Sequence, residues 1–498
     1  MLEALLQFAH PWIILLIIAG SFWGMLAGSL PGISASMALI LILPFTFGMT
    51  AIQAIALLIS TYVGAMCGGH ISAVLMRTPG TPSAAATVFD GYPLAKQGRA
   101  GFAIGLAILS SAFGGIVSGI ALGFLAPLLA RWALNFQSAE FFALALLGLS
   151  CTASIGAKSW SKALLSCTLG IMIGTVGMDP ISGAQRFMFG NFALAEGISF
   201  IPVMIGTFAF SEVFRNIIQQ VKNEKEGYVK PKADKVKIEL VSPKMILKHP
   251  VTFIKSALIG LGIGIIPAAG ASIASMVSYG EARRSSKNPE LFGHGAEEGI
   301  IASEASDSAA VGGTLIPTLT LGIPGGPVAA IILVSLTMQG IVPGPQLIAN
   351  NPNAFFGILW TIVFASFMLF AWGMVITKQF SKIMDIPYPI LGAIIMCFGL
   401  IGTFTLRSNT LDLIIMFAFS FVGLAFDKFG FSVPSFVLGL VLGPLAEVGF
   451  RRQLIVTGGD FSSFITRPVS LVVLLFAIFS FVWAFAGPTI KEKLKKEK

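Results

Sequence analysis

The stretch LGIPGGPVAA, residues 321–330, places two prolines and two glycines in the middle of an apolar run. It is preceded by TLIPTLT and followed by IILVSL, which read as helical membrane segments. Proline has no amide hydrogen to donate and clashes with the preceding helical turn, and glycine adopts backbone conformations that other residues avoid. The stretch is therefore predicted to interrupt a helix.

A matched copy of this break lies in the first half of the chain. GGHISAVLMRTPGTPSAAATVFDGYP (68–93) and GGTLIPTLTLGIPGGPVAAIILVSLTMQGIVP (312–343) share a Gly-Gly pair, an apolar run, a PGxP tip, an alanine-containing run and a closing turn. A second pair, GSLPGISAS (28–36) and GIIPAAGAS (264–272), runs from an apolar segment into small residues. Paired Gly/Pro-interrupted segments in corresponding halves indicate the binding site of a secondary transporter.

Composition indicates that lipid surrounds most of this chain. Of the 498 residues, 55% are hydrophobic and 11% are charged, and the mean hydropathy is +0.87. A soluble protein carries roughly 25% charged residues. The predicted fold class is an all-α polytopic integral membrane protein with roughly 12 hydrophobic segments, in two inverted repeats with broken helices and re-entrant hairpins.

The net charge of +9 indicates orientation in the membrane and not a nucleic-acid partner. It concentrates in residues 222–248, with eight lysines against four acids, and in the tail KEKLKKEK. Lysine-rich loops stay on the cytoplasmic side. The predicted organisation is a first transmembrane repeat (1–220), a cytoplasmic lysine-rich linker (221–250), a second transmembrane repeat with extra C-terminal helices (251–487) and a basic cytoplasmic tail (488–498).

The two PGxP tips are predicted to form a substrate site. A backbone break survives in a membrane only against protein or a water-filled cavity, because each stranded polar group costs several kcal/mol. Each tip is followed by a new helix, whose N-terminus offers free N–H groups and partial positive charge to an anion. Two such ends suit a substrate with several carboxylates. The predicted substrate-binding residues are Ser34, Ser36, Arg77, Thr78, Pro79, Gly80, Thr81, Ser272, Ser275, Pro324, Gly325 and Gly326.

Some of these residues have alternative interpretations. The serines also suit close helix packing, which small residues favour. Arg77 either clamps a carboxylate with two hydrogen bonds or extends to the membrane interface. Asp90 is interpreted as stabilising the turn that closes the first hairpin. His70 has only Cys67 beside it as a potential metal ligand, so no metal site is predicted there.

The segment SEASDS (303–308) places acids at membrane depth, where ionisable groups are costly and usually functional. Asp307, with Ser306 and Glu304, is predicted to carry a coupling cation, either Na⁺ or H⁺. The alternative is a helix start at the interface, where acids are favoured by the helix dipole. No resident cofactor is expected.

Several long stretches resemble the large membrane subunit of the tripartite tricarboxylate transporters, the TctA family. They include LPGISASMALILILPFTFGM, YVGAMCGGHISAVL, TPGTPSAAATVFDGYPLAKQGRAG, SYGEARRSSKNPELFGHGAEEG and LTLGIPGGPVAAIILVSLTMQGIVPGPQL. The resemblance covers nearly the whole chain. It implies a permease of the bacterial inner membrane that works with a small TctB-like membrane subunit and a periplasmic TctC-like solute-binding protein.

The resemblance further implies secondary transport of a di- or tricarboxylate, driven by an ion gradient. The lack of a GxxxxGK[ST] sequence agrees with this. Family members commonly have Ser in place of His70, Asn in place of Arg77, an Asn pair in place of Asp307-Ser308, and PGxGA in place of residues 267–271. These departures leave the transport class intact and leave the carboxylate and the coupling ion open.

An anion channel and a membrane-embedded enzyme are the alternatives to a carrier. Paired hairpins also line channels, but the duplicated tips with sparse acids favour an occluding site. Four scattered histidines and the lack of GxSxG and HExxH sequences argue against an enzyme. The sequence therefore predicts a carrier that works by alternating access.

Overall fold

The computed structural model describes residues 2–8, 10–30, 33–152, 160–225, 241–266, 270–383 and 388–496. Predictions for Pro31 and Gly32 in the first small-residue break lie outside the described residues, as do those for 267–269 in the second break. The same holds for 226–240 of the lysine-rich linker and for 497–498 of the tail.

The described chain is a bundle of helices with one short antiparallel strand pair, β1 (Gly177–Met178) and β2 (Gln185–Arg186). Seven of the described helical segments are long and apolar enough to cross a membrane: Pro11–Ser29, Ala51–Met76, Val88–Ala133, Phe200–Lys222, Pro352–Gly373, Thr410–Phe429 and Val433–Val456. Shorter apolar helices accompany them. The predicted class, an all-α polytopic membrane protein, is confirmed.

The two halves contain corresponding elements in the same order. The first half has α2 (Pro11–Ser29), α3 (Ala35–Ile42), α4 (Ala51–Met76), the 3₁₀ turn η2 (Pro82–Ala85), α5 (Val88–Leu94) and α6 (Ala100–Ala133). The second half has α12 (Pro250–Ile265), α13 (Gly270–Ser285), α14 (Glu297–Leu321), α15 (Pro327–Met338) and α17 (Pro352–Ile383). In both halves the first helix ends at a small-residue break, and the long central helix ends at a PGxP tip.

Small residues bring the first and central helices of each half into close, parallel contact. A Cβ at Gly24 or Gly28 of α2 would overlap the carbonyl oxygens of Thr61 or Ala65 in α4. In the second half, α12 meets α14 through Gly260 and Gly264 in the same way. Backbones approach this closely in membrane helices when glycine removes the side chain.

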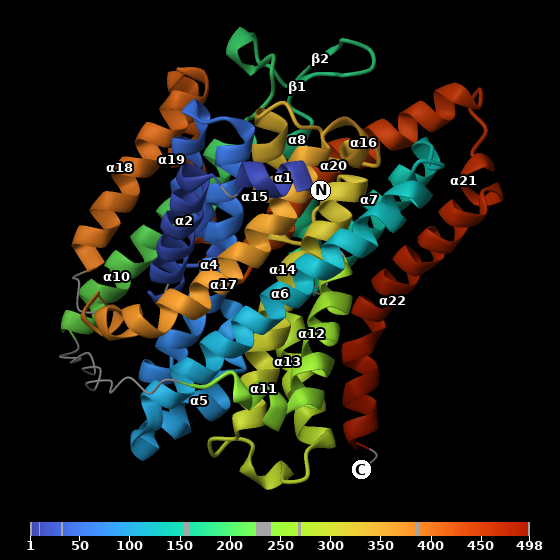
Figure 1. Ribbon diagram of the computed structural model, residues 1–498. Helices are drawn as coiled ribbons and strands as arrows, with labels where there is room; N and C mark the ends of the chain where they lie inside the picture. Colours follow the sequence, from blue (N-terminus) through green and yellow to red (C-terminus); the bar gives the residue numbers. More distant parts are fainter. Residues whose placement is uncertain are drawn as a thin grey trace.

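The central helices of the two halves run in opposite directions. Tyr62 of α4 lies beside Thr314 of α14, with 3.2 Å between their hydroxyl oxygens. Further along α4, His70 Nδ1 lies 3.3 Å from Glu304 Oε2, so the partner numbers fall as the α4 numbers rise. Figure 1 shows α4 in blue and α14 in yellow crossing through the centre. Corresponding helices with opposite directions make the two halves inverted repeats.

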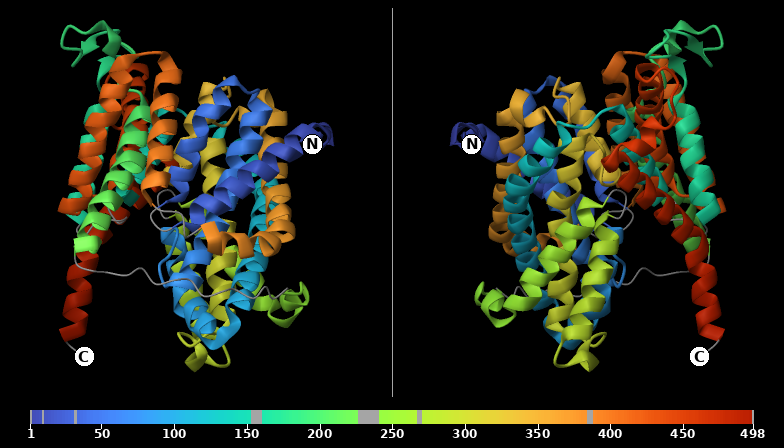
Figure 2. Two further views of the ribbon diagram at one scale, coloured as in Figure 1. Left: turned by 90° about the vertical axis from the view of Figure 1, so that its left-hand side faces the viewer. Right: turned by 90° about the vertical axis from the view of Figure 1, so that its right-hand side faces the viewer.

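The remaining long helices form a second bundle beside the repeats (Figure 2). They are α7 (Ser138–Thr152), α8 (Trp160–Gly174), α9 (Phe200–Met204), the π-helical segment η5 (Ile205–Phe210), α10 (Ser211–Lys225), α18 (Tyr388–Arg407), α19 (Thr410–Phe429), α20 (Val433–Val456) and α22 (Pro468–Lys496). Glycines again set the packing, with Gly170 of α8 against the Phe436 carbonyl of α20. Pro44 against Gly402 is one contact between the bundles.

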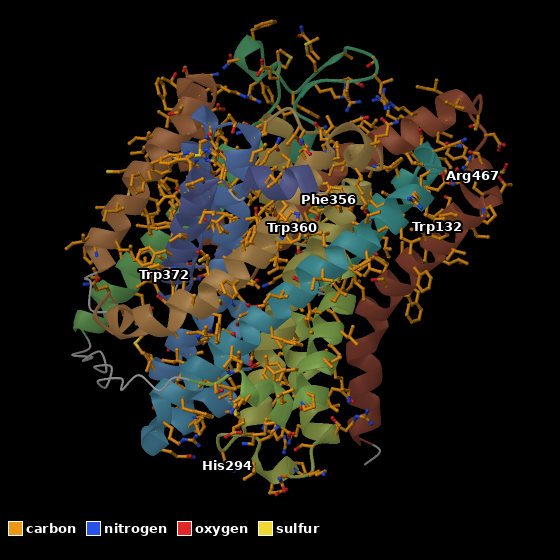
Figure 3. The ribbon with its side chains drawn as sticks, in the orientation of Figure 1. Trp132, His294, Phe356, Trp360, Trp372 and Arg467 are labelled. Carbon is orange, nitrogen blue, oxygen red and sulfur yellow. The ribbon has the colours of Figure 1, made fainter. Side chains whose placement is uncertain are left out.

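Short elements complete the described chain: α1 (Leu2–Phe8), η1 (Leu43–Gly48), η3 (Ala95–Arg99), η4 (Phe192–Leu194), α11 (Lys244–Lys248), η6 (Pro289–Leu291), α16 (Leu347–Asn350) and α21 (Ser463–Thr466). The β1–β2 pair stands at the upper end of Figure 1. His294 lies at the lower end in Figure 3, and α22 also ends there. The molecule therefore presents the strand pair and the His294 loop at opposite ends.

Candidate functional site

The first tip, between α4 and η2, folds back onto the helix before it. Arg77 ends α4 in the left-handed region with φ of 58°. The N–H of Gly80 then donates to the carbonyl oxygen of Gly69 at 3.1 Å. A Cβ at Gly80 would overlap the Gly28 carbonyl oxygen and lie 2.8 Å from Ser72 Oγ, so this position requires glycine. The tip is packed against protein, as a break inside a membrane requires.

The second tip, between α14 and α15, has the same form. Gly322 ends α14 in the left-handed region with φ of 69°. The N–H of Gly325 donates to Thr318 Oγ1 at 3.3 Å. A Cβ at Gly325 would lie 2.8 Å from Thr314 Cα, again leaving room only for glycine. Gly326 then begins α15 in an extended conformation, with φ of 178°.

The two tips rest on equivalent positions of the two central helices. Gly80 packs on Gly69, and Gly325 packs on Thr314. We call Gly69 and Thr314 the tip seats. They differ chemically, because Thr314 carries a hydroxyl and Gly69 has no side chain. The Thr314 hydroxyl bonds to Tyr62 of the opposite repeat at 3.2 Å, so the second seat is tied directly to α4.

The predicted substrate residues divide by burial. The buried ones are Ser36, Gly80, Thr81, Ser275, Pro324, Gly325 and Gly326, the partly buried ones are Ser34 and Pro79, and the exposed ones are Arg77, Thr78 and Ser272. Ser34 Oγ accepts the Met37 N–H and caps α3. The Arg77 guanidinium lies over the Tyr92 ring, 5.8 Å from its centroid. In this conformation Arg77, Thr78 and Ser272 stand outside the buried tips.

One predicted serine connects the small-residue break of the second repeat to the first tip. Ser275 Oγ in α13 donates to the carbonyl oxygen of Ser83 in η2 at 2.7 Å. Thr81 and Ser83 hydroxyls lie 3.1 Å apart in the same buried turn. The turn after the first tip is therefore held by both repeats.

A buried carboxylate, Glu304 of α14, lies against this turn. Its side chain is fully buried. Thr87 Oγ1, which follows η2, donates to Glu304 Oε1 at 2.5 Å, and Ser111 Oγ of α6 donates to Oε2 at 2.9 Å. Ser303 shares the Thr87 hydroxyl at 2.9 Å. Two hydroxyl donors suit an ionised carboxylate, which only accepts hydrogen bonds.

Asp307, one helical turn further along α14, has no such donors. Its side chain is fully buried, and neither carboxylate oxygen has a hydrogen-bond partner among the described residues. Ser83 is the neighbouring hydroxyl, and Glu304 is the neighbouring charge. The Ser306 hydroxyl donates within its own helix to Ala302 at 2.7 Å. An unpartnered buried carboxylate marks this point as chemically unusual.

His70 of α4 stands opposite these acids. It is fully buried, and its Nδ1 lies 3.3 Å from Glu304 Oε2, outside hydrogen-bonding geometry. The other ring nitrogen, Nε2, also has no hydrogen-bond partner in the described structure. Within the described ranges, no three His, Cys, Asp or Glu side chains gather to hold a metal ion. We call Glu304, Asp307 and His70 the buried triad.

Asp90 has a different role from the one predicted. Its Oδ1 accepts three backbone N–H groups of the loop that leads into α14: Gly293 at 2.7 Å, Gly295 at 3.0 Å and Ala296 at 2.9 Å. The prediction that Asp90 mainly stabilises the turn closing the first hairpin is therefore wrong. Asp90 joins the first hairpin to the second repeat, and local sequence cannot reveal a partner that far along the chain.

A charged cavity of about 950 Å³ opens beside this junction. Its lining includes Arg99, Lys255 and Glu281. Lys255 Nζ lies 2.5 Å from Glu281 Oε1, and Arg284 Nε lies 2.7 Å from Oε2. Hydrogen bonds from Arg284 and then Lys255 lower the pKa of Glu281 to about 2. The polar segment at the end of α13 therefore forms a network of ion pairs.

Sequence reasoning missed the hydroxyl partners that complete the site. Four hydroxyl residues bind one another or Glu304 across the repeats: Tyr62, Thr87, Ser111 and Thr314. Hydroxyl residues are common in membrane helices, and nothing local distinguishes these four. The one available signal was their position in the two matched segments, which applies to Thr87 and Thr314.

The fold and the paired tips define a multi-pass membrane protein of two inverted repeats. Comparison with known families supplies the next step: residues 14–438 match the model of the tripartite tricarboxylate transporter TctA family. The chain belongs to this family. It is a family of transporters, and membership implies the large subunit of a tripartite tricarboxylate transporter.

Two relatives come from Agrobacterium vitis. The chain is 36% identical over 477 residues to an uncharacterised 52.8 kDa protein in the TAR-I ttuC' 3' region. This match covers 96% of this chain and 94% of the relative. It is 34% identical over 231 residues to an uncharacterised protein in the TAR-II ttuC' 3' region, covering 46% of this chain and 95% of that relative. No solved structure matches the chain.

Proposed function

We propose that this chain is the permease subunit of an ion-driven importer of a di- or tricarboxylate. A periplasmic solute-binding protein of the TctC type would deliver the substrate, and a small TctB-like subunit would complete the membrane complex. The observation that carries this proposal is the pair of buried glycine tips on antiparallel central helices, next to the buried triad. Family membership supports the same transport class.

Substrate carboxylates bind between the tips in this proposal. Among the described residues, the N–H groups of Thr81 and Gly326 have no hydrogen-bond acceptor. The N–H groups of Gly80 and Gly325 are occupied by Gly69 and Thr318. When a tip opens, its glycine exchanges that internal acceptor for a carboxylate oxygen, which offers the stronger charge-assisted bond. The exchange couples binding to a change in the tip.

Transport then proceeds by alternating access, with the repeats moving against the second bundle. Asp307, with Glu304 and Ser306 beside it, carries the coupling cation in this scheme. The protein lies in the bacterial inner membrane, with the lysine-rich linker and the C-terminus in the cytoplasm. This orientation puts the His294 loop on the cytoplasmic side and the β1–β2 pair on the periplasmic side.

Counterflow in reconstituted vesicles tests the proposal. Vesicles loaded with unlabelled citrate, malate or succinate should accumulate the same labelled acid without any ion gradient, as a carrier does and a channel does not. Gly80→Val and Gly325→Val should abolish this exchange. Gly262→Val is the matched control, because nothing lies within 4 Å of a Cβ at Gly262. Normal exchange in both tip variants would refute binding at the tips.

A further inference from the structure

The buried triad contains three ionisable side chains, and among the described residues only Glu304 receives hydrogen bonds. Glu304 is provided with two hydroxyl donors, whereas the Asp307 oxygens and both His70 nitrogens have none among the described residues. An isolated buried charge costs far more than a buried neutral group. Asp307 therefore has the surroundings of a neutral acid, and Glu304 has those of an ionised one.

The charges that surround Asp307 support this assignment. α14 itself contributes Glu304, a like charge within one turn. Two carboxylates this close are not both ionised in a dry site. From α4, the titratable groups Tyr62 and Cys67 lie within electrostatic reach of Asp307, and neither supplies positive charge. Ser83 of η2 is the neighbouring hydroxyl.

His70 is the basic side chain of the triad. Its ring reaches Glu304 at 3.3 Å from the opposite repeat. α6 contributes the neutral Ser111 to the same carboxylate. A protonated His70 would offset the charge of Glu304 and leave Asp307 as the group free to gain and lose a proton. His70 acts through Glu304 and is a positioning residue.

We propose that the coupling ion is a proton and that Asp307 carries it, with the His70–Glu304 pair holding the compensating charge. This inference rests on the proposed function. An O–H bond forms at one Asp307 carboxylate oxygen with a proton from water on one side of the membrane. The same bond breaks when the site faces the other side, where water accepts the proton. No oxidation or other bond change is involved.

The location of Asp307 links this proton to the substrate site. Ser83 beside Asp307 lies in the turn that follows the first tip, and Thr87, bonded to Glu304, ends that turn. Ser275 holds the same turn through the Ser83 carbonyl. A change of charge at Asp307 therefore acts on the segment that positions the first tip. That connection is what coupled transport requires.

Infrared difference spectroscopy of the purified protein in lipid tests the protonated acid without any substrate. We expect a protonated-carboxyl band that Asp307→Asn removes and Asp307→Glu retains at a shifted frequency. In His70→Gln the band should persist to higher pH, because the Glu304 charge is then unopposed. Asp460→Asn, at an exposed acid, is the matched control and should leave the band unchanged. The assignment would be overturned if the wild type lacked the band. It would also be overturned if Glu304→Gln removed the band and Asp307→Asn did not.

Transport of labelled citrate, malate or succinate then tests the coupling. Wild-type uptake should rise with an inward pH gradient at equal Na⁺, and Asp307→Asn should lose that rise. Uptake driven by a Na⁺ gradient at equal pH, and indifferent to a pH gradient, would refute proton coupling. A wild type without counterflow for any of the three acids would refute the proposed function instead.

Discussion

Tyr62 and Thr314 share a hydrogen bond of 3.2 Å between hydroxyls that belong to opposite repeats. Thr314 is also the seat of the second tip, where Gly325 packs against its backbone. A side chain of the first repeat therefore contacts the residue that supports the tip of the second. This bond is one route by which one half of the molecule can act on the tip of the other.

Tyr62→Phe should weaken this link without opening a cavity. The Thr314 hydroxyl keeps its bond to Val311 at 3.0 Å, so the loss should be about 1 kcal/mol in the free energy of unfolding. The counterflow rate should be affected more strongly than the free energy of unfolding, because Thr314 is a tip seat. Thermal unfolding in lipid nanodiscs and exchange rates in vesicles measure the two effects. Tyr92→Phe is the control, and equal effects in both variants would contradict a specific role for Tyr62.

Gly325→Ala and Gly326→Ala form a matched pair of adjacent changes. A Cβ at Gly325 would press on the Thr314 backbone, whereas nothing lies within 4 Å of a Cβ at Gly326, whose extended backbone suits any residue. Overpacking at Gly325 should cost about 1–3 kcal/mol. Thermal unfolding should show a clear loss for Gly325→Ala and little change for Gly326→Ala. Comparable stability in the two variants would mean that the second tip is not packed as described.

Asp90→Ala should release the loop that leads into α14. The three N–H groups of Gly293, Gly295 and Ala296 would lose a charged acceptor, which should cost about 3 kcal/mol. Hydrogen exchange of residues 293–296 should accelerate in the alanine variant. Asp90→Asn retains an acceptor oxygen, so its exchange rate should lie between those of the wild type and Asp90→Ala. Unchanged exchange in Asp90→Ala would show that the loop is held by other contacts.

Acid should weaken the ion-pair network around Glu281. Arg284 and Lys255 lower the pKa of this carboxyl from 4.5 to about 2. A lowered folded-state pKa stabilises the protein above the unfolded-state value, and that contribution disappears as pH falls from about 4.5 towards about 2. Wild-type thermal stability should therefore drop more steeply than that of Glu281→Gln across this range. Glu290→Gln, at an exposed position of the turn η6 that follows α13, is the control and should follow the wild type.

Much of the fold was predictable because the residues that decide it are compatible with few backbone structures. Proline and glycine at 324–326 exclude a continuous helix, and the structure places a buried tip there. The matched copy at 79–82 behaves in the same way. Composition alone required a membrane protein, since so few charges cannot cover a soluble surface of this size. These features depend on local chemistry, which a single sequence displays.

The partners of the buried acids were not predictable, for an equally physical reason. Glu304 binds hydroxyls from Thr87 and Ser111, both in the other repeat. Asp90 likewise accepts its hydrogen bonds from a distant loop. Such pairings are set by how helices pack, and serine or threonine at any one position satisfies its own helix just as well. Only the assembled bundle distinguishes the two uses.

The unequal tip seats make the two tips of this molecule different. The first tip rests on the bare backbone of Gly69, and its release breaks one main-chain hydrogen bond. The second tip rests on a threonine that is already bound to the opposite half. A chain with the same hairpin twice has thus diverged at one supporting position. The two tips are therefore alike in form, but the seat of the second tip carries a hydroxyl bonded to the opposite repeat, whereas the seat of the first tip has no side chain.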